Sequence, residues 1–555
     1  PPQVIKTLLV GDEPRDIVFA GTPNGQGVFP RAFITTAHRG QAYPDPAPNE
    51  KYGDFFTPSV GRADVWVFDA DNLGVEPAGA PESVVVLFGD TPRALATSPA
   101  GDKVYVGVFH SGNRSTVIPE QGSFTAPNDN FNTPPEVPTI VQFDGNNWVD
   151  SNGTVDNSVQ LQLPDYDVFE IDATGASVTE LQRFSGVGTI LFNIAVNPTT
   201  GKLYVSNTEA NNLMPNEPDI TGNLHRSQVT VIDPATGAVS PRHINKHINY
   251  NQVPSPAGTS AASLATPTDM IIDSAGTLYL AAFGSAKLGV FDTAELDNDS
   301  FTPSAANQIA LSAGGPSGVV IDNANNLLYV MTRFDNGISI IDRSTRVEVD
   351  HLTLFNPEPA SIVAGRKFLY DAADSSSNGE AACAACHVFG QMDNLAWDLS
   401  DNTATDVILN PNPFNPVTNQ VVQFLGQPAF HPMKGPMTTQ TLRGMQNGGA
   451  MHWRGDRSNG FFGMSADDED EAFRNFIVAF EGLLGREDLI AEADMQRFAD
   501  FALSLVLPPN PVRAIDNSLT AAQQGGRDFY LGTRRADGVN FGAFGFTCDG
   551  CHTLD

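Results

Sequence analysis

The feature that most constrains this chain is a short cysteine–histidine pattern that occurs twice. The pattern Cys-x-x-Cys-His occupies residues 383–387 and returns at residues 548–552, and it uses all 4 cysteines of the 555-residue sequence. Two thiols at this spacing add to the vinyl groups of a haem, and the adjacent imidazole binds the iron. The sequence therefore predicts two covalently attached c-type haems. The residues that would hold them are Cys383, Cys386, His387, Cys548, Cys551 and His552.

Other uses of paired cysteines explain this pattern less well. A redox dithiol does not need a histidine after the second cysteine, and it would not need one twice. A zinc site built from both pairs would have to join distant segments, and it would leave the histidines without a role. Two structural disulfides are the remaining alternative, and they too leave the histidines unexplained.

The charge balance limits the partners of this chain. There are 64 acidic and 31 basic residues, which give a formal net charge of -33. Nucleic acids and anionic membrane surfaces would repel such a protein. No apolar run approaches the length of a membrane span. Because haem is attached to such motifs outside the cytoplasm, we expect a periplasmic, extracellular or cell-surface protein. The sequence shows no signal peptide, so residue 1 is not expected to be the translational start.

The first 357 residues repeat one pattern of strands. Five times an apolar strand leads through a turn rich in Gly, Asn and Asp to a second apolar strand, and a third strand then ends in an acid. The first strands begin near residues 14, 92, 192, 267 and 316, and the third strands end at Asp69, Asp172, Asp233, Asp292 and Asp342. Such spacing predicts an all-β propeller. We expect five to seven blades, because the long insertion 112–163 could contain another.

Further expectations concern single segments of this propeller. Residues 4–10 are expected to form a strand that closes the ring and removes an open edge. The aspartates that end strands are interpreted as turn acceptors rather than calcium ligands, although calcium stays an open alternative. His243 and His247 are interpreted as hydrogen-bonded side chains rather than a metal pair. The stretch 201–206, Gly-Lys-Leu-Tyr-Val-Ser, resembles the YVTN-type β-propellers. We interpret the propeller as a docking or assembly module.

Residues 358–512 predict a first, mainly α-helical haem domain. A helix-compatible stretch at 361–370 precedes the haem motif, and apolar residues recur at helical spacing from 489 to 505. This arrangement resembles class I cytochrome c domains. Residues 513–555 begin a second domain of the same kind, because the Gly-Arg-x-Phe theme at 365–368 returns at 526–529 ahead of the second motif.

The sixth ligand of the first haem is sought between the motif and the last helix. The Met and His residues there are Met392, His431, Met433, Met437, Met445, Met451, His452 and Met464. The stretch 430–437 is the densest cluster, and its prolines and glycine could hold a loop over a haem face. We favour Met437, with Met433, His431 and His452 as alternatives. A thioether ligand raises the reduction potential of a haem.

Two stretches resemble the bacterial di-haem cytochrome c peroxidase superfamily. They are residues 439–444, Thr-Gln-Thr-Leu-Arg-Gly, and residues 452–457, His-Trp-Arg-Gly-Asp-Arg. The resemblance implies that Arg443, Trp453 and Arg454 line the haem. The chain departs from that family at residues 471–477, where the family carries a methionine ligand and this chain has none.

The most economical function is electron transfer by an exported di-haem cytochrome. Its partner would be a redox protein or another cytochrome, and a homo-oligomer or head-to-tail assembly is also considered. The alternative is a di-haem peroxidase that reduces hydrogen peroxide. A third hypothesis makes the propeller the substrate-binding part of a dehydrogenase, but no acid–base cluster supports it. An electron carrier keeps both irons six-coordinate, whereas a peroxidase opens one site.

The end of the sequence gives a prediction about the native protein. Three residues follow His552, whereas a cytochrome c domain needs roughly 50 to 100 residues after its motif to cover the porphyrin. We expect the native polypeptide to continue. An intact mass of the protein from its natural source equal to 555 residues plus two haems would contradict this, and would require another part of the chain or a neighbouring subunit to cover the second haem.

Overall fold

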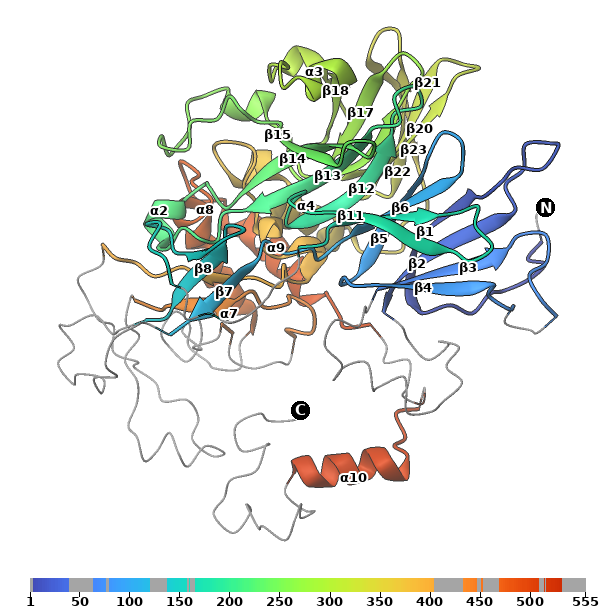
Figure 1. Ribbon diagram of the computed structural model, residues 1–555. Coiled ribbons are helices and arrows are strands. Elements are labelled where there is room, and N and C mark those ends of the chain that lie inside the picture. Colours follow the sequence, from blue (N-terminus) through green and yellow to red (C-terminus); the bar gives the residue numbers. More distant parts are fainter. Residues whose placement is uncertain are drawn as a thin grey trace.

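The computed structural model places a β-sheet region and a helical region side by side (Figure 1). It describes residues 3–38, 63–75, 79–119, 137–156, 159, 165–403, 433–446, 451–452, 469–508, 514 and 516–531. All structural statements below refer to these residues.

Five four-stranded antiparallel sheets, called blades one to five, fill the first 353 residues. Blade one is β1 (Asp12–Ala20), β2 (Arg31–His38), β3 (Ala63–Asp69) and β4 (Ser83–Leu87). Blade two is β5 (Pro92–Thr97), β6 (Lys103–Val108), β10 (Val168–Asp172) and β11 (Thr179–Phe184). Blade three is β12 (Ile190–Val196), β13 (Leu203–Ala210), β14 (His225–Asp233) and β15 (Ala238–His243). Blade four is β16 (Pro267–Ile272), β17 (Thr277–Ala282), β18 (Lys287–Asp292) and β19 (Gln308–Ala310). Blade five is β20 (Pro316–Asp322), β21 (Leu327–Thr332), β22 (Gly337–Asp342) and β23 (Val347–Thr353).

The blades pack in chain order with their first strands adjacent. β1 contacts β5, β5 contacts β12, β12 contacts β16, and β16 contacts β20. Each neighbouring pair shares an apolar core; Phe33 of blade one, for example, lies in the same buried cluster as Phe169 of blade two. Sheets that each bury their faces against the next one form the arrangement of a β-propeller, as the repeats predict.

Carboxylates tie neighbouring first strands together. The first strand of every blade has an irregular register, for instance between Pro14 and Asp16 in β1. In β5 the backbone N–H of Leu95 donates to Asp16 Oδ2 at 2.8 Å. In β20 the N–H of Val319 donates to Asp269 Oδ2 at 2.7 Å. A side chain of one blade therefore satisfies a backbone donor of the next blade.

The aspartates at the ends of third strands act as turn acceptors, as predicted. Asp69 Oδ1 accepts the N–H of Asp71 at 2.9 Å, and Asp342 Oδ1 accepts the N–H of Ser344 at 2.8 Å. Such bonds let a short side chain stabilise the turn that leads to the outer strand.

The expected strand at residues 4–10 is wrong. These residues form no strand in the structure. Leu8 and Val10 instead pack against a buried cluster on blade one that contains Trp66 and Phe68. These two side chains bury apolar surface there, whereas Val4, Ile5 and Leu9 remain exposed.

The insertion 112–163 does not form a four-stranded blade in its described part. It contains a three-stranded sheet made of β7 (Ser115–Ile118), β8 (Thr139–Phe143) and β9 (Trp148–Val149). β8 contacts β24 (Ala396–Asp398) of the helical region. The insertion therefore belongs to the junction between the two regions. Short helices within the propeller are α2 (Glu217–Ile220), η2 (Thr259–Ala262), α3 (Thr293–Asp297) and η3 (Ala305–Asn307).

The second part of the chain is mainly helical where it is described. Its elements are α4 (Ala360–Tyr370), α5 (Ala372–Ser375), η4 (Cys383–Ala385), η5 (Val388–Gly390), β24, β25 (Pro436–Thr438), α7 (Glu469–Arg474), η6 (Asn475–Val478), α8 (Ala479–Gly482), α9 (Glu492–Leu503) and α10 (Ala521–Tyr530). The described residues from 360 to 508 are called the helical region. α4 and α9 match the two helices predicted before and after the motif. None of the described helices has the length and hydrophobicity needed to cross a membrane.

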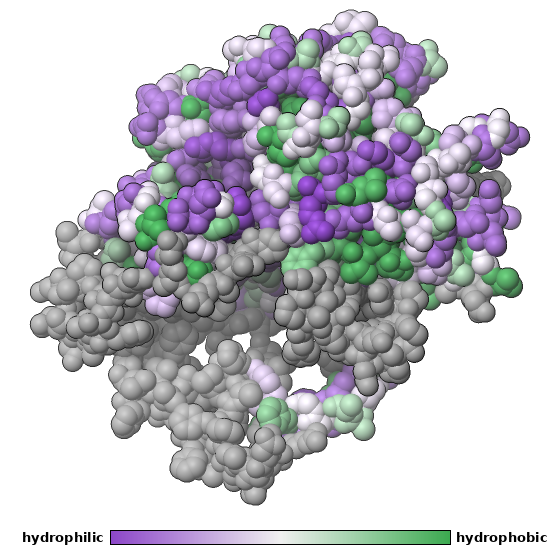
Figure 2. Space-filling view, viewed as in Figure 1, coloured by the Kyte–Doolittle hydropathy of each residue, from purple (hydrophilic) through white to green (hydrophobic). Residues whose placement is uncertain are grey.

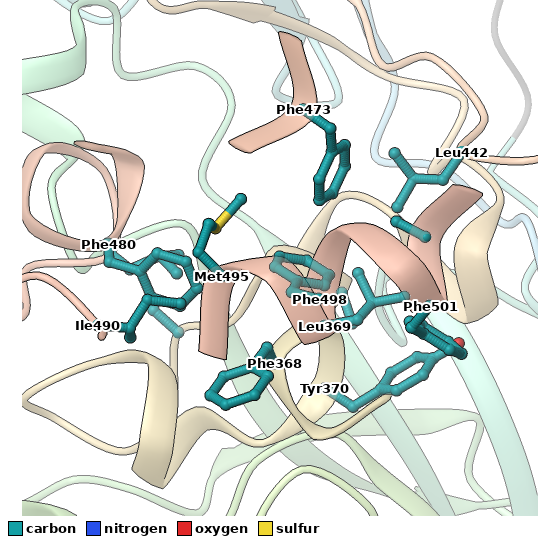
Figure 3. Close-up of a cluster of buried hydrophobic side chains, with 14 of the residues drawn as sticks. Phe368, Leu369, Tyr370, Leu442, Phe473, Phe480, Ile490, Met495, Phe498 and Phe501 are labelled. Atoms are coloured by element: carbon teal, nitrogen blue, oxygen red, sulfur yellow. The ribbon is translucent and has the colours of Figure 1, made fainter. Parts of the chain in front are cut away.

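α4 and α9 pack closely because a glycine lies at their contact. A Cβ atom on Gly365 would lie well inside van der Waals distance of the Arg497 carbonyl oxygen. Around this contact Phe368 faces Phe498, with ring centroids 6.4 Å apart (Figure 3). The same core includes Phe334 of blade five, so it continues from the helices into the propeller.

Gly365→Ala tests this contact, and Gly526→Ala is its matched control. Gly526 holds the corresponding place in the sequence repeat, and its Cβ would meet no atom within 4 Å. We expect Gly365→Ala to lower the free energy of unfolding by about 1–3 kcal/mol through overpacking. Gly526→Ala should be neutral or gain up to about 1 kcal/mol through helix propensity. Equal effects in chemical denaturation would contradict the packing described.

Candidate functional site

The first cysteine–histidine motif forms one tight turn beside α4. The backbone N–H of Cys386 donates to the Cys383 carbonyl at 3.3 Å, and the N–H of His387 donates to the same carbonyl at 3.0 Å. This turn directs the two thiols and the imidazole to one cavity, which all three side chains line. The motif is therefore a single site in the folded chain.

The cavity is apolar and large enough for a small organic group. Its volume is about 390 Å³, within the roughly 300–1,000 Å³ of typical ligand sites. Its hydrophobic walls come from blade three, β24, β25, α7, α8 and α9; Leu442, Phe473, Phe480 and Phe498 are drawn in Figure 3. The polar residues on the lining are Thr438, Thr439, Gln440, Thr441, Arg443 and His452.

His387 is held in the form that binds metals. Burial lowers the pKa of its imidazole to about 4, against the opposite effect of the nearby backbone groups of Gln440 and Gln391. The ring is therefore neutral at pH 7 and keeps a nitrogen lone pair. Its Nδ1 atom is buried without a hydrogen-bond partner. A neutral, buried imidazole on an apolar cavity fits a proximal iron ligand.

Both thiols are free and stay protonated. Burial raises the pKa of Cys383 to about 12, and burial together with the Asp393 carboxylate raises the pKa of Cys386 well above its ordinary value. A reactive cysteine needs a thiolate, so these environments disfavour that alternative. Among the described residues, no group of three or more His, Cys, Asp or Glu side chains is arranged to hold a metal ion.

Several of the predicted distal ligands line the same cavity. Met437 lies on β25, where it pairs with Trp397 of β24, and both line the cavity. Met445, Met451 and His452 line it too. Met433 does not contribute to the lining. His431 and Met464 lie outside the described residues.

Of the three residues that the family resemblance implies for a haem contact, one lies among the described residues. Arg443 lines the cavity, as the resemblance implies for a haem contact. Trp453 and Arg454 lie outside the described residues. The second motif, Cys548, Cys551 and His552, lies outside them as well. The second haem domain therefore stays a prediction.

The structure adds a buried link between the motif and the propeller that the sequence did not indicate. Phe389 lies two positions after His387 and has a φ of 52°, a left-handed conformation that costs about 1–3 kcal/mol for a residue with a side chain. Its ring packs among Phe109, Phe192 and Phe283 of three different blades. Isolated phenylalanines in a propeller repeat look like ordinary core residues, so no sequence pattern marked this contact.

A second link is the buried carboxylate of Glu380. It accepts hydrogen bonds from the Ser227 N–H and the Asn245 side chain, each at 2.8 Å, and from the Tyr250 hydroxyl. His243 Nε2 lies 3.3 Å from it. Burial alone would raise the pKa of Glu380. The hydrogen bond and the charge of His243, together with the other hydrogen-bond donors, outweigh that effect and hold the pKa at about 2.

This network also settles the role of the two neighbouring propeller histidines. His243 contacts Glu380 and Tyr250, whereas His247 Nε2 lies 3.1 Å from the Thr259 carbonyl. They therefore have separate hydrogen-bond partners and do not form a pair, as expected from the sequence.

Comparisons with known proteins leave the family open. No protein-family model matches the chain. A stretch of 125 residues is 30% identical to the outer membrane usher protein YraJ of Escherichia coli K12, which is 21% of this chain and 14% of the usher. The chain thus spans a small fraction of that relative.

Solved structures show only distant likeness. Kuenenia stuttgartiensis hydrazine synthase is 13% identical with a TM-score of 0.28, over 59% of this chain and 83% of that one. U3-55K is 10% identical with a TM-score of 0.34, over 64% and 70%. The periplasmic gluconolactonase PpgL of Pseudomonas aeruginosa is 12% identical with a TM-score of 0.30, over 54% and 66%. Since every TM-score is low, the description of the fold rests on the sheet topology above.

Glu380→Gln tests the buried link through its pH dependence. The folded pKa of about 2 lies below the ordinary 4.5, so ionised Glu380 stabilises the fold above pH 4.5 and loses this effect as the pH falls toward 2. We expect the variant to be less stable by about 3 kcal/mol at neutral pH and by progressively less in acid. Denaturant titrations measure this, with exposed Glu487→Gln as control. A constant difference between pH 2 and 7 would contradict it.

Proposed function

We propose that the cavity holds a covalently attached c-type haem and that the protein is an exported di-haem cytochrome that transfers electrons. Cys383 and Cys386 would carry the thioether bonds, and His387 would be the proximal ligand. The observation that supports this most is that all three side chains of the first motif line one apolar cavity. The second haem would be attached at Cys548 and Cys551, with His552 as ligand.

The cavity walls suit this group. Porphyrin is a flat hydrocarbon surface, and Leu442, Phe473 and Phe498 would exclude water from it. Arg443 is the charged side chain on the lining and would pair with a propionate. When bound, the haem supplies a one-electron redox centre, and the apolar surroundings tune its potential. His387 arrives already neutral, so iron binding needs no proton release from it.

A six-coordinate iron favours electron transfer over peroxidase chemistry. Met437 is the proposed distal ligand, and Met445, Met451 and His452 are further donors on the same lining. A cavity with so many soft or imidazole donors is suited to saturating the iron rather than leaving a position open for peroxide.

The outer surface suggests the nature of the partner. Much of the propeller surface in Figure 2 is hydrophilic, and the chain carries a net charge of -33. A redox protein or cytochrome with a positive docking patch would be attracted to it, and the attraction would weaken with salt. The compartment would be the periplasm or the cell surface, because c-type haem is attached outside the cytoplasm.

Haem staining after denaturing electrophoresis tests the attachment. Wild-type protein made in a host with the c-type maturation apparatus should carry two haems per chain. Cys383→Ala combined with Cys386→Ala should lose half of the stain, and Cys548→Ala with Cys551→Ala should lose the other half. Wild-type protein without covalent haem would overturn the proposed function.

Spectroscopy of the loaded protein then separates the two candidate activities. Low-spin spectra in both redox states, with a methionine-to-iron charge-transfer band that disappears in Met437→Ala, are expected of the electron carrier. If the band survives, the same test passes to Met445 and Met451, whereas a low-spin wild type without the band would point to His452. A stable high-spin haem with rapid peroxide turnover would favour the peroxidase instead.

A further inference from the structure

The segment that carries His387 contacts the propeller through the ring of Phe389. Phe389 stacks on Phe109 with ring centroids 6.0 Å apart. It meets Phe192 edge to face at 6.0 Å and Phe283 edge to face at 5.7 Å. These three rings come from blades two, three and four, so the residue two positions after the predicted iron ligand is held by three blades at once.

A cation completes this aromatic cluster. The guanidinium carbon of Arg93, on the first strand of blade two, lies 4.7 Å from the ring centroid of Phe109 and 4.7 Å from that of Phe389. Burial lowers the pKa of Arg93 to about 10, so the group stays charged at neutral pH. A cation over two aromatic faces is attracted by their quadrupoles. The propeller therefore places a positive charge over the ring of Phe389, with Arg15 and Asp16 as its charged neighbours.

The backbone connects the ring of Phe389 rigidly to His387. Gly390 donates its N–H to the His387 carbonyl at 3.0 Å, and its own carbonyl accepts the N–H of Leu442 at 3.0 Å. Phe389 between them has a positive φ. A bulky residue keeps this conformation only where its surroundings impose it. The contacts of the ring thus bear on a constrained residue next to the turn that carries His387.

We propose that Arg93 and Phe389 are positioning residues through which the propeller sets the reduction potential of the first haem. This inference rests on the proposed attachment of haem at Cys383 and Cys386. Phe389 fixes the orientation of the His387 ring. Arg93 supplies a nearby positive charge, which disfavours the oxidised, more positive state and raises the potential. The propeller is then one wall of the redox site as well as a docking module.

The charge is tested with Arg93→Met and Arg93→Lys. Both keep a long side chain, but only lysine keeps the charge. In haem-loaded protein, Arg93→Met should lower the midpoint potential of one of the two haems, with a change of about tenfold in its oxidised-to-reduced ratio, or about 59 mV for one electron. Arg93→Lys should leave the potential close to that of the wild type.

The orientation is tested with Phe389→Ala against Phe301→Ala. Phe301 is a matched control, because it is buried in the core between blades three and four and has Lys246 Nζ 3.8 Å from its ring centroid. Phe389→Ala should change the low-spin EPR g-values and the potential of one haem. Phe301→Ala should lower only the melting temperature.

The potentials and g-values of the Arg93 and Phe389 variants decide whether the propeller acts on the first haem. Unchanged potentials and g-values in both Arg93→Met and Phe389→Ala would overturn the inference and leave these residues as ordinary core packing. If Phe389→Ala does not fold, the pair Arg93→Met and Arg93→Lys still tests the charge. Absence of covalent haem from the wild type would instead refute the proposed function, and haem staining detects that separately.

Discussion

The two regions are joined by one apolar core that contains side chains from both. Phe283 and Phe334 come from the propeller, whereas Phe368, Phe498 and the helices around them come from the helical region, and all lie in one buried cluster. The helical region therefore buries part of its apolar surface against the propeller. The propeller also contributes Leu224 to the lining of the cavity, so the candidate site lies at the junction of the two regions.

Buried polar groups make this junction specific. Glu380 lies almost fully out of water, yet donors from Ser227, Asn245 and Tyr250 on the propeller satisfy it. Removing a carboxylate from water is costly unless such partners are in place. The helical region can therefore dock in one orientation, and that orientation brings the motif turn to blades two, three and four. The hydrogen bonds of Glu380 thus orient the helical region and, with it, the turn that carries His387.

Local patterns in the sequence predicted the parts of the structure that local physics determines. The repeated strands, the turn aspartates such as Asp342, and the helices α4 and α9 follow from periodicity and turn chemistry. The motif at 383–387 was identified because its residue spacing is specific, and Met437 was favoured because it lies in the densest Met/His cluster, 430–437. Contacts between distant segments could not be predicted this way. Phe389 looks like any core phenylalanine. Residues 4–10 look like a strand, but Leu8 and Val10 pack on blade one and the segment forms none.

The central claim is that iron is bound in the cavity between the motif turn and β25, with the propeller behind the motif. Anomalous diffraction from crystals of the haem-loaded protein at the iron absorption edge tests this most directly. We expect one iron peak inside the cavity, within coordination distance of an imidazole nitrogen of His387 and facing Met437 or another donor on the lining. An iron peak elsewhere with this cavity empty, or His387 turned away from it, would contradict the account.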